Sequence, residues 1–183
     1  MPTLRAPGGP TSTFALEQGS LLVFPKELPK KSPGEKHHVL LPAPSESTEP
    51  WIVSWPGEYD FNGIAIHAIG QAEGKQISYL VMAEGLRTGF LSSPLRDWTE
   101  QEIEQLGDLD ILVIPADDAK LVQKIVEEVD PPVVIPLRTK DEKTFQEVLR
   151  ACGAKDEAPV KEVKLKKSGL PVDSRVVYVL ETA

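Results

Sequence analysis

The chain has 183 residues and a formal net charge of −8, because 28 acidic residues outweigh 20 basic ones. Hydrophobic residues make up 40% of it and charged residues 26%, which is ordinary for a folded globular protein and excludes disorder as its global state. The negative field disfavours nucleic acid and anionic membrane surfaces as partners, and no apolar run approaches the roughly 20 residues that span a bilayer.

The length and the cysteine count bound the organisation of the chain. Neither a linker nor an internal repeat divides the sequence, so we predict a single domain over residues 1–183. A lone cysteine, Cys152, excludes an intramolecular disulfide, and the first ten residues, MPTLRAPGGP, lack the apolar core of a signal peptide. We therefore expect a cytoplasmic protein.

The first half of the chain predicts three β-hairpins, each with two short apolar strands joined by a turn that contains glycine. The turns are Gln18-Gly19, Asn62-Gly63 and Glu84-Gly85. The strands are expected at residues 13–17 and 20–24, 58–61 and 64–69, and 76–83 and 86–91. Asn-Gly is the strongest of these signals, because a type I′ turn needs positive φ at both central residues. A further strand is expected at residues 37–41.

The pattern changes after about residue 92, where apolar residues recur at helical spacing between short strands. Thr99 and Glu102 have the spacing of a capping box and open a helix that reaches Leu106. Asp117 or Asp118 then caps a second helix with a continuous apolar stripe. Strands are expected at residues 110–114 and 133–135. This half of the chain therefore has an α/β pattern.

A third helix and two strands complete the predicted elements. Thr139 and Glu142 repeat the capping-box spacing ahead of a helix whose apolar stripe includes Cys152. Strands are expected at residues 160–166 and 175–180, the first half-exposed and the second buried on both faces. Hairpins early and helices late indicate sheets packed together and covered by helices.

Three motifs in this order carry a family resemblance. Residues 56–64 read PGEYDFNGI, residues 99–115 read TEQEIEQLGDLDILVIP, and residues 133–139 read VVIPLRT. They are similar to three motifs of the small lactonase-like branch of the metallo-β-lactamase fold, which includes the ascorbate-6-phosphate lactonases. These motifs are the PGEYE…GV hairpin, the helix and strand TEEQLEELGDVDVLLIP, and the strand ending VIPMHY. The resemblance implies a metallo-β-lactamase-like αβ/βα sandwich, reduced in size, with two mixed sheets flanked by helices.

The resemblance also implies a zinc site of histidines and aspartates, since zinc takes imidazole and carboxylate ligands and lowers the pKa of its bound water to about 7. This chain carries other residues at the matching positions. Where the family carries its HxHxDH motif after a strand, this chain has Ala43, Ser45, Ser47 and Thr48. Where the family's next hairpin ends in HLGD, the histidine and aspartate are replaced by Phe90 and Ser93. Gly70, Gln71 and Ala72 stand where a further ligand is expected, and Arg138 stands at the histidine of VIPMHY. No complete zinc site can be transferred, so no metal, no other cofactor and no catalytic residue is expected.

The substitutions favour a pseudoenzyme that binds a protein partner, a copy of itself or a small anionic ligand. Hydroxyl groups and one permanently charged guanidinium in a vestigial pocket suit an anion. The residues of this pocket are Ser45, Ser47, Thr48, Ser93 and Arg138. Alternatively, Arg138 pairs with a nearby carboxylate and fills the vacated space. Self-association through exposed tryptophans is a further possibility, with Trp51, Trp55 and Trp98 as candidates.

The alternative function is a metal-dependent hydrolase of the lactonase type with a rebuilt metal site. Its candidate ligands are the three histidines, but His37 and His38 are adjacent in a strand and point to opposite faces. We expect His67 to be packed or hydrogen-bonded. Ser93 and its neighbour Ser92 lack the GxSxG context of a nucleophile. Helix capping explains the carboxylates at residues 117 and 118 more simply than a weak cation site does.

Overall fold

Alternating burial along the N-terminal strands gives the first sheet one face toward the core and one toward solvent. The computed structural model describes residues 1–154 and 156–182. The strand order of the first sheet is β12-β1-β2-β3-β4-β5. Its strands are β1 (Thr3–Gly8), β2 (Thr11–Ala15), β3 (Ser20–Val23), β4 (His37–Leu40), β5 (Ile52–Val53) and β12 (Val163–Lys164). β3, β4 and β5 run parallel, and the others run antiparallel, so the sheet is mixed.

The second sheet combines an antiparallel meander with a parallel part, in the order β13-β11-β10-β9-β8-β7-β6. Its strands are β6 (Gly57–Phe61), β7 (Ile64–Gln71), β8 (Gln76–Ala83), β9 (Leu86–Phe90), β10 (Ile111–Pro115), β11 (Val133–Leu137) and β13 (Val176–Val177). The turn between β6 and β7 has φ of 53° at Asn62 and 88° at Gly63, as a type I′ turn requires. All three predicted hairpins are present.

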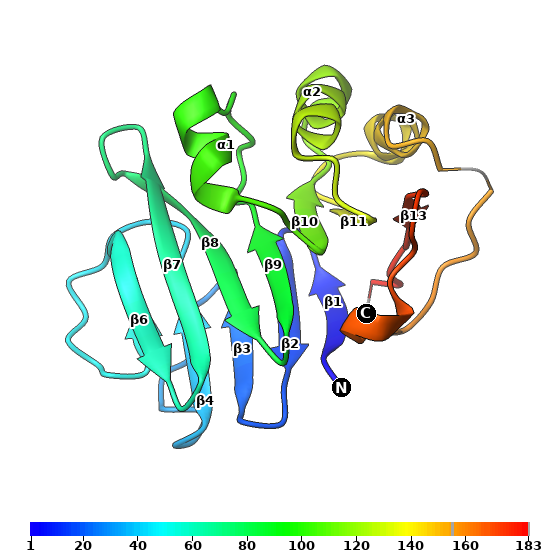
Figure 1. The fold of residues 1–183 in the computed structure, drawn as a ribbon. Coiled ribbons are helices and arrows are strands. Elements are labelled where there is room, and N and C mark those ends of the chain that lie inside the picture. The colour runs from blue at the N-terminus through cyan, green and yellow to red at the C-terminus, as the bar shows by residue number, and fades with distance from the viewer. Residues whose placement is uncertain (155, 183) are drawn as a thin grey trace.

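Three helices cover the second sheet: α1 (Glu100–Leu106), α2 (Ala119–Val129) and α3 (Glu142–Ala151). They lie together on one side of the molecule, as Figure 1 shows. The predicted capping box of α1 is confirmed, since Thr99 and Glu102 bond reciprocally. The predicted capping box of α3 is wrong: Asp141 caps this helix by accepting from the Thr144 backbone N–H, while the Thr139 side chain bonds elsewhere. A short 3-10 helix, η1 (Lys167–Gly169), precedes the C-terminal strand.

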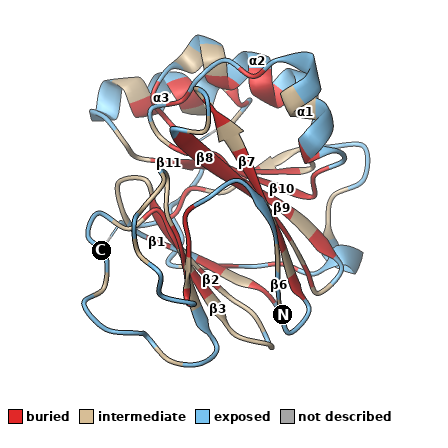
Figure 2. Cartoon of the chain, turned by 90° about the vertical axis from the view of Figure 1, so that its left-hand side faces the viewer, coloured by how far each residue is buried: buried red, intermediate tan, exposed pale blue. Residues whose placement is uncertain are grey.

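Two apolar clusters hold these layers together. One lies between the sheets and includes Phe14 and Phe90, whose ring centroids are 5.6 Å apart. The other lies between the second sheet and the helices and includes Val122, Ile125 and Phe145. Figure 2 shows buried residues in both layers and exposed ones on the outer faces of the helices. The predicted small α/β sandwich of two mixed sheets flanked by helices is confirmed, with all three α-helices on the second sheet.

Several finer expectations are corrected. Trp98 is 2% exposed and Trp51 is 9% exposed, because both indoles pack into the protein, so only Trp55, at 52%, is an exposed tryptophan.

β1 was not predicted, because proline and glycine interrupt its apolar pattern. The two tail strands are shorter than expected, since ladder pairing is confined to β12, β13 and a bridge between Val160 and Leu180. None of the helices in residues 1–154 and 156–182 has the length and apolarity needed to cross a membrane.

Candidate functional site

The carboxyl ends of β9, β10 and β11 meet at one edge of the second sheet, because these three strands are parallel neighbours. The chain continues from them into three loops that start at Leu91, Ala116 and Arg138. Ligand sites of open α/β sheets lie at such strand ends. This edge, which we call the strand-end site, therefore contains two of the predicted site residues, Ser93 and Arg138.

A single carboxylate connects the loops of the strand-end site. Asp117 is only 8% exposed. Its Oδ2 accepts from Ser93 Oγ at 2.8 Å and from the Leu95 backbone N–H at 2.7 Å, and its Oδ1 accepts from Thr139 Oγ1. Lys140 Nζ donates to the Asp117 backbone carbonyl at 2.8 Å. Asp117 thus ties the β9, β10 and β11 loops together, while the neighbouring Asp118 caps α2.

A second hydrogen-bonded group lies beside it, at the start of β8. Gln76 Nε2 donates to Ser92 Oγ at 3.0 Å and to the Pro94 carbonyl at 2.8 Å, and Gln76 Oε1 accepts from Arg96 Nε. Ser78 Oγ accepts from the Ser92 backbone N–H at 2.9 Å. Gln76, Ser78 and Ser92 are all buried. Sequence reasoning missed Gln76 and Ser78, and the one available signal was their polarity within the apolar strand QISYLVMA.

Arg138 turns toward α3. Its Nε donates to Glu142 Oε2 at 3.2 Å, and its guanidinium carbon lies 4.1 Å from the centroid of the Phe145 ring. Its Nη1 also reaches the Leu180 carbonyl at 3.5 Å. Hydrogen bonds from Gln146 and Arg138 hold the pKa of Glu142 below its ordinary value. Arg138 therefore has a carboxylate partner, as in the alternative raised by the sequence.

The loop between β4 and β5 carries the other predicted pocket residues, Ser45, Ser47 and Thr48. Ser45 Oγ accepts from the Ser47 backbone N–H at 3.2 Å, and Ser47 Oγ accepts from the Glu49 backbone N–H at 3.3 Å. Trp55 Nε1 donates to the Ser45 carbonyl at 3.2 Å, and Thr48 is exposed. These contacts stay within the loop and its immediate surroundings, so the five predicted residues fall into separate bonded groups.

The three histidines are dispersed. His37 Nδ1 bonds Ser20 Oγ, whereas the His38 ring stacks on Phe61 with centroids 3.6 Å apart. Burial, and secondarily the charge of His37, lower the pKa of His38. His67 lies on β7 directly across from Glu58. Over residues 1–154 and 156–182, no three histidine, cysteine, aspartate or glutamate side chains converge in a geometry that could hold a metal ion.

The lone cysteine is not part of any of these groups. Cys152 is 3% exposed in the cluster between the helices and the second sheet. Burial raises the pKa of its thiol to about 12, so the reactive thiolate is scarce at neutral pH. Cys152 is therefore a small buried hydrophobe, as its position on the apolar stripe of the helix predicts.

Comparison with known proteins identifies the family. The model of the beta-lactamase superfamily domain matches residues 27–138. The chain belongs to the beta-lactamase superfamily. The matched region contains β4 to β11, α1 and α2, and hence the β9 and β10 loops of the strand-end site and Arg138 at the start of its β11 loop. No curated protein matches the chain.

Several solved structures share the fold of this chain. A candidate Zn-dependent hydrolase of the metallo-β-lactamase superfamily from Thermotoga maritima is 17% identical with a TM-score of 0.79, and each chain covers 100% of the other. Igni18, a metallo hydrolase from Ignicoccus hospitalis KIN4/I, is 12% identical with a TM-score of 0.62, over 90% of this chain and 99% of its own. The metallo-β-lactamase fold protein YhfI from Bacillus subtilis is 10% identical with a TM-score of 0.59, over 84% and 95%. At these identities the likeness shows the fold alone.

The metallo-β-lactamase fold implies zinc, and the residues at the strand-end site do not fit it. Catalytic zinc takes three protein ligands and keeps a fourth position open. The one buried carboxylate here, Asp117, already accepts three hydrogen bonds. The histidines lie on β4 and β7 and not in the loops of β9, β10 and β11, and Phe90 is packed between the sheets. The arrangement can hold loops together, but it offers no ligand set for a metal.

Proposed function

We propose that this chain is a non-catalytic member of the beta-lactamase superfamily that acts by binding, with residues 1–183 forming one domain. The observation that carries this proposal is the Asp117 network, which occupies the strand-end site with donors instead of metal ligands. Its hydroxyls and amide satisfy the carboxylate, so a zinc ion would have to displace them without gaining an imidazole. The single cysteine supports a reducing compartment such as the cytoplasm.

The competing proposal is a lactonase-like metal-dependent hydrolase with a rebuilt site. It draws on the hydrolase names of the structural neighbours from Thermotoga maritima and Ignicoccus hospitalis. Its ligands would have to come from His37, His38 and His67, which bond Ser20, stack on Phe61 and face Glu58 respectively. Bringing these side chains together would break contacts on two separate sheets.

Metal content separates the two proposals. The protein is purified without chelator, analysed for transition metals, loaded with zinc, desalted and analysed again. We expect well under about 0.1 zinc per chain in both samples, because zinc retention needs at least three converging ligands. The matched control is the His67→Gln variant, which removes one candidate ligand and keeps a side chain of similar polarity. One zinc per chain that is lost in this variant, together with hydrolysis of a lactone, would overturn the proposal.

The bound species can be a protein or a small anion. Anion binding by Ser45, Ser47, Thr48, Ser93 and Arg138 remains a prediction. The Arg138 guanidinium supports it as the only permanent cation among them, and the bond to Glu142 opposes it, because an anion must displace a carboxylate already in place. Partner binding has stronger support in a different part of the molecule, along one side of the sandwich.

A further inference from the structure

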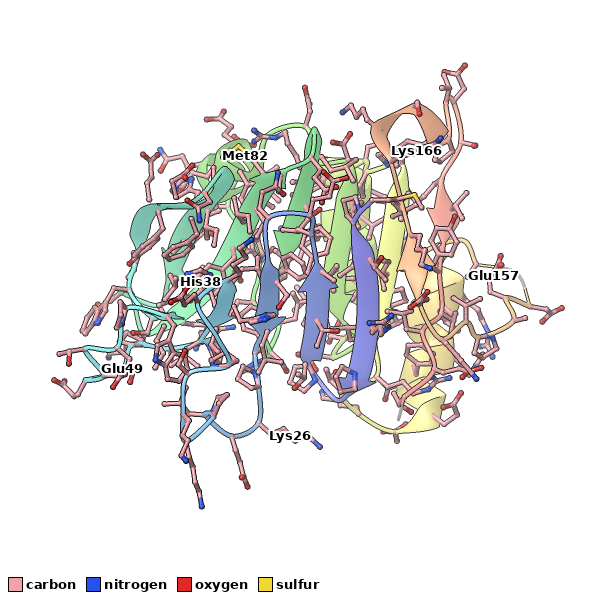
Figure 3. All side chains as sticks on the ribbon, turned by 90° about the horizontal axis from the view of Figure 1, so that it is seen from below. Lys26, His38, Glu49, Met82, Glu157 and Lys166 are labelled. Carbon is pink, nitrogen blue, oxygen red and sulfur yellow. The ribbon has the colours of Figure 1, made fainter. Side chains whose placement is uncertain are left out.

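One continuous stretch of the chain, which includes the strand β6, carries acidic residues but no lysine or arginine. From residue 37 to residue 74 the sequence contains no lysine or arginine. The same stretch contains five carboxylates, at Glu46, Glu49, Glu58, Asp60 and Glu73. It forms β4, β5, β6 and β7, so it supplies β5 and β6, the terminal strands of the two sheets. In Figure 3, His38 and Glu49 lie toward this side, whereas Lys166 and Glu157 lie toward the other.

β6 is an edge strand with its outer backbone groups unpaired. Among the described residues it pairs with β7 alone, and Figure 1 shows it at the end of its sheet. The two-residue turn makes Phe61 and Ile64 a hydrogen-bonded pair, and bonding alternates from there, so Tyr59 also bonds to β7. The N–H and C=O groups of Glu58 and Asp60 therefore point away from the sheet. Such an edge is a template for a further strand.

The surroundings of β6 provide places for side chains of an added strand. Trp55, two residues before the strand, is 52% exposed, and its indole is fixed by the bond to the Ser45 carbonyl. A hollow of about 390 Å³ adjoins the strand on the face of Glu58 and Asp60. Its lining is acidic at β6 and largely apolar on β7 and β8, and consists of Glu58, Tyr59, Asp60, Ala65, Ile66, His67 and Met82.

We propose that β6 is a docking edge for an extended, lysine- or arginine-rich segment of a partner protein, which adds as a strand beside Glu58 and Asp60. This inference rests on the proposed binding function and gives it a surface. Main-chain bonds to Glu58 and Asp60 supply the attachment, and the carboxylates select a basic sequence. The alkyl stems of lysine or arginine suit the apolar part of the hollow, while their charged ends meet the carboxylates.

Charge also decides against a second copy of this chain as the occupant. In a symmetric antiparallel pairing of two β6 strands centred on Tyr59, Glu58 of each chain would face Asp60 of the other. A symmetric parallel pairing would place like residues side by side. Like charges directly opposite each other destabilise a sheet. A basic segment replaces this repulsion with attraction.

The test uses hydrogen exchange of single amides in the whole protein, read by NMR. The probe is a capped peptide of alternating lysine and valine, and the control peptide has glutamate in place of lysine. Without peptide, we expect fast exchange at Glu58 and Asp60 and slow exchange at Tyr59 and Phe61, because only the latter pair bonds to β7. The lysine peptide should slow exchange at Glu58 and Asp60 by at least about tenfold, and salt should weaken its binding.

Two variants separate strand addition from charge. Glu58→Pro removes an outward N–H that β7 does not use, so it should weaken binding of the lysine peptide by about tenfold or more. Slow exchange at Tyr59 and Phe61 in this variant shows that the hairpin is intact. Glu58→Gln keeps the backbone donor and should weaken binding only a few-fold, with less salt dependence. Glu147 is exposed on the outer face of α3, so Glu147→Gln is the matched charge control and should bind as the wild type does.

Several results would overturn the docking edge. These are unchanged exchange at Glu58 and Asp60 with the lysine peptide, equal protection by the glutamate peptide, or full binding by Glu58→Pro. Protection that rises with protein concentration in the absence of peptide would assign the edge to a second copy and would also overturn it. Zinc retention and lactone hydrolysis test the proposed function separately, so failure of one proposal is distinguishable from failure of the other.

Discussion

The strand-end site and the β6 edge differ in where their polar groups are directed. At the strand-end site, Asp117 and Gln76 bond to residues of the same chain, and both side chains are buried. At the β6 edge, Glu58 and Asp60 are exposed and their backbone groups face outward. The first region is closed by its own hydrogen bonds, and the second is open.

The two regions therefore differ in how many hydrogen-bonding groups remain free for another molecule. Buried polar groups are costly unless paired, so a buried polar site is stable only when its groups bond to one another. Asp117, Ser93 and Thr139 meet this requirement, which leaves them few free donors or acceptors for a ligand. An edge strand has its missing partners in solvent and can exchange water for another chain.

Removing the carboxylate at the centre of the strand-end site should change the stability of the protein most. Asp117→Ala removes the acceptor for Ser93, Thr139 and the buried Leu95 N–H, and leaves these donors unpaired. We expect the free energy of unfolding to fall by about 3 kcal/mol, since stranded buried donors cost more than the bonds themselves contribute. Urea denaturation of both proteins at neutral pH measures this difference.

The neighbouring aspartate supplies the control for that measurement. Asp118→Ala removes only the α2 cap, so it should cost about 1 kcal/mol. Equal losses for the two variants would mean that the Asp117 network contributes no more than a helix cap. A gain in stability for Asp117→Ala would contradict the account of the strand-end site altogether.

Local signals in the sequence predicted most helices and strands. The site was predicted less well, because its contacts join residues that are far apart in the sequence. The Thr99 capping box formed because both of its partners lie within four consecutive residues. The same spacing at Thr139 did not form one, because Asp117, 22 positions away, accepts from that hydroxyl instead. Asp141 is adjacent to the first residue of α3 and takes the cap.

Burial of single residues was equally hard to foresee. The sequence allowed Trp98 to be an exposed contact, yet it lies in the core between the helices and the second sheet. Gln76 and Ser78 form hydrogen bonds with Ser92, which lies 16 and 14 positions away, and no local sequence pattern predicts such contacts. The free edge of β6, in contrast, follows from the Asn62-Gly63 turn and the strand order, of which only the turn was readable from sequence.

A smaller effect is expected from acid at the start of α3, next to the strand-end site. Bonds from the Thr144 backbone and hydroxyl lower the pKa of Asp141 from its ordinary value of 3.8. A carboxyl group with a lowered pKa in the folded state stabilises the protein above its unfolded pKa, and this stability is lost as pH falls through the folded value. The stability gap between wild type and Asp141→Ala should therefore be wider at neutral pH than at about pH 3.

The matched control for the acid effect is Asp141→Asn, which keeps the cap in a form that does not titrate. Urea midpoints of the three proteins at neutral and acidic pH measure the gap. Wild type should lose more stability than Asp141→Asn on acidification. An equal loss would show that the Thr144 bonds to Asp141 do not couple α3 to pH.

A still smaller change is expected from the test of whether Arg138 at the strand-end site binds anions. Phosphate has to displace Glu142 from Arg138, so we expect it to raise the melting temperature of the wild type by only about 1 to 2 °C over chloride of equal ionic strength. Arg138→Ala should show no rise, while Glu142→Gln, which weakens the competitor, should show a larger one. Equal shifts in all three proteins would contradict anion binding at Arg138 and leave the proposed β6 edge as the remaining candidate surface.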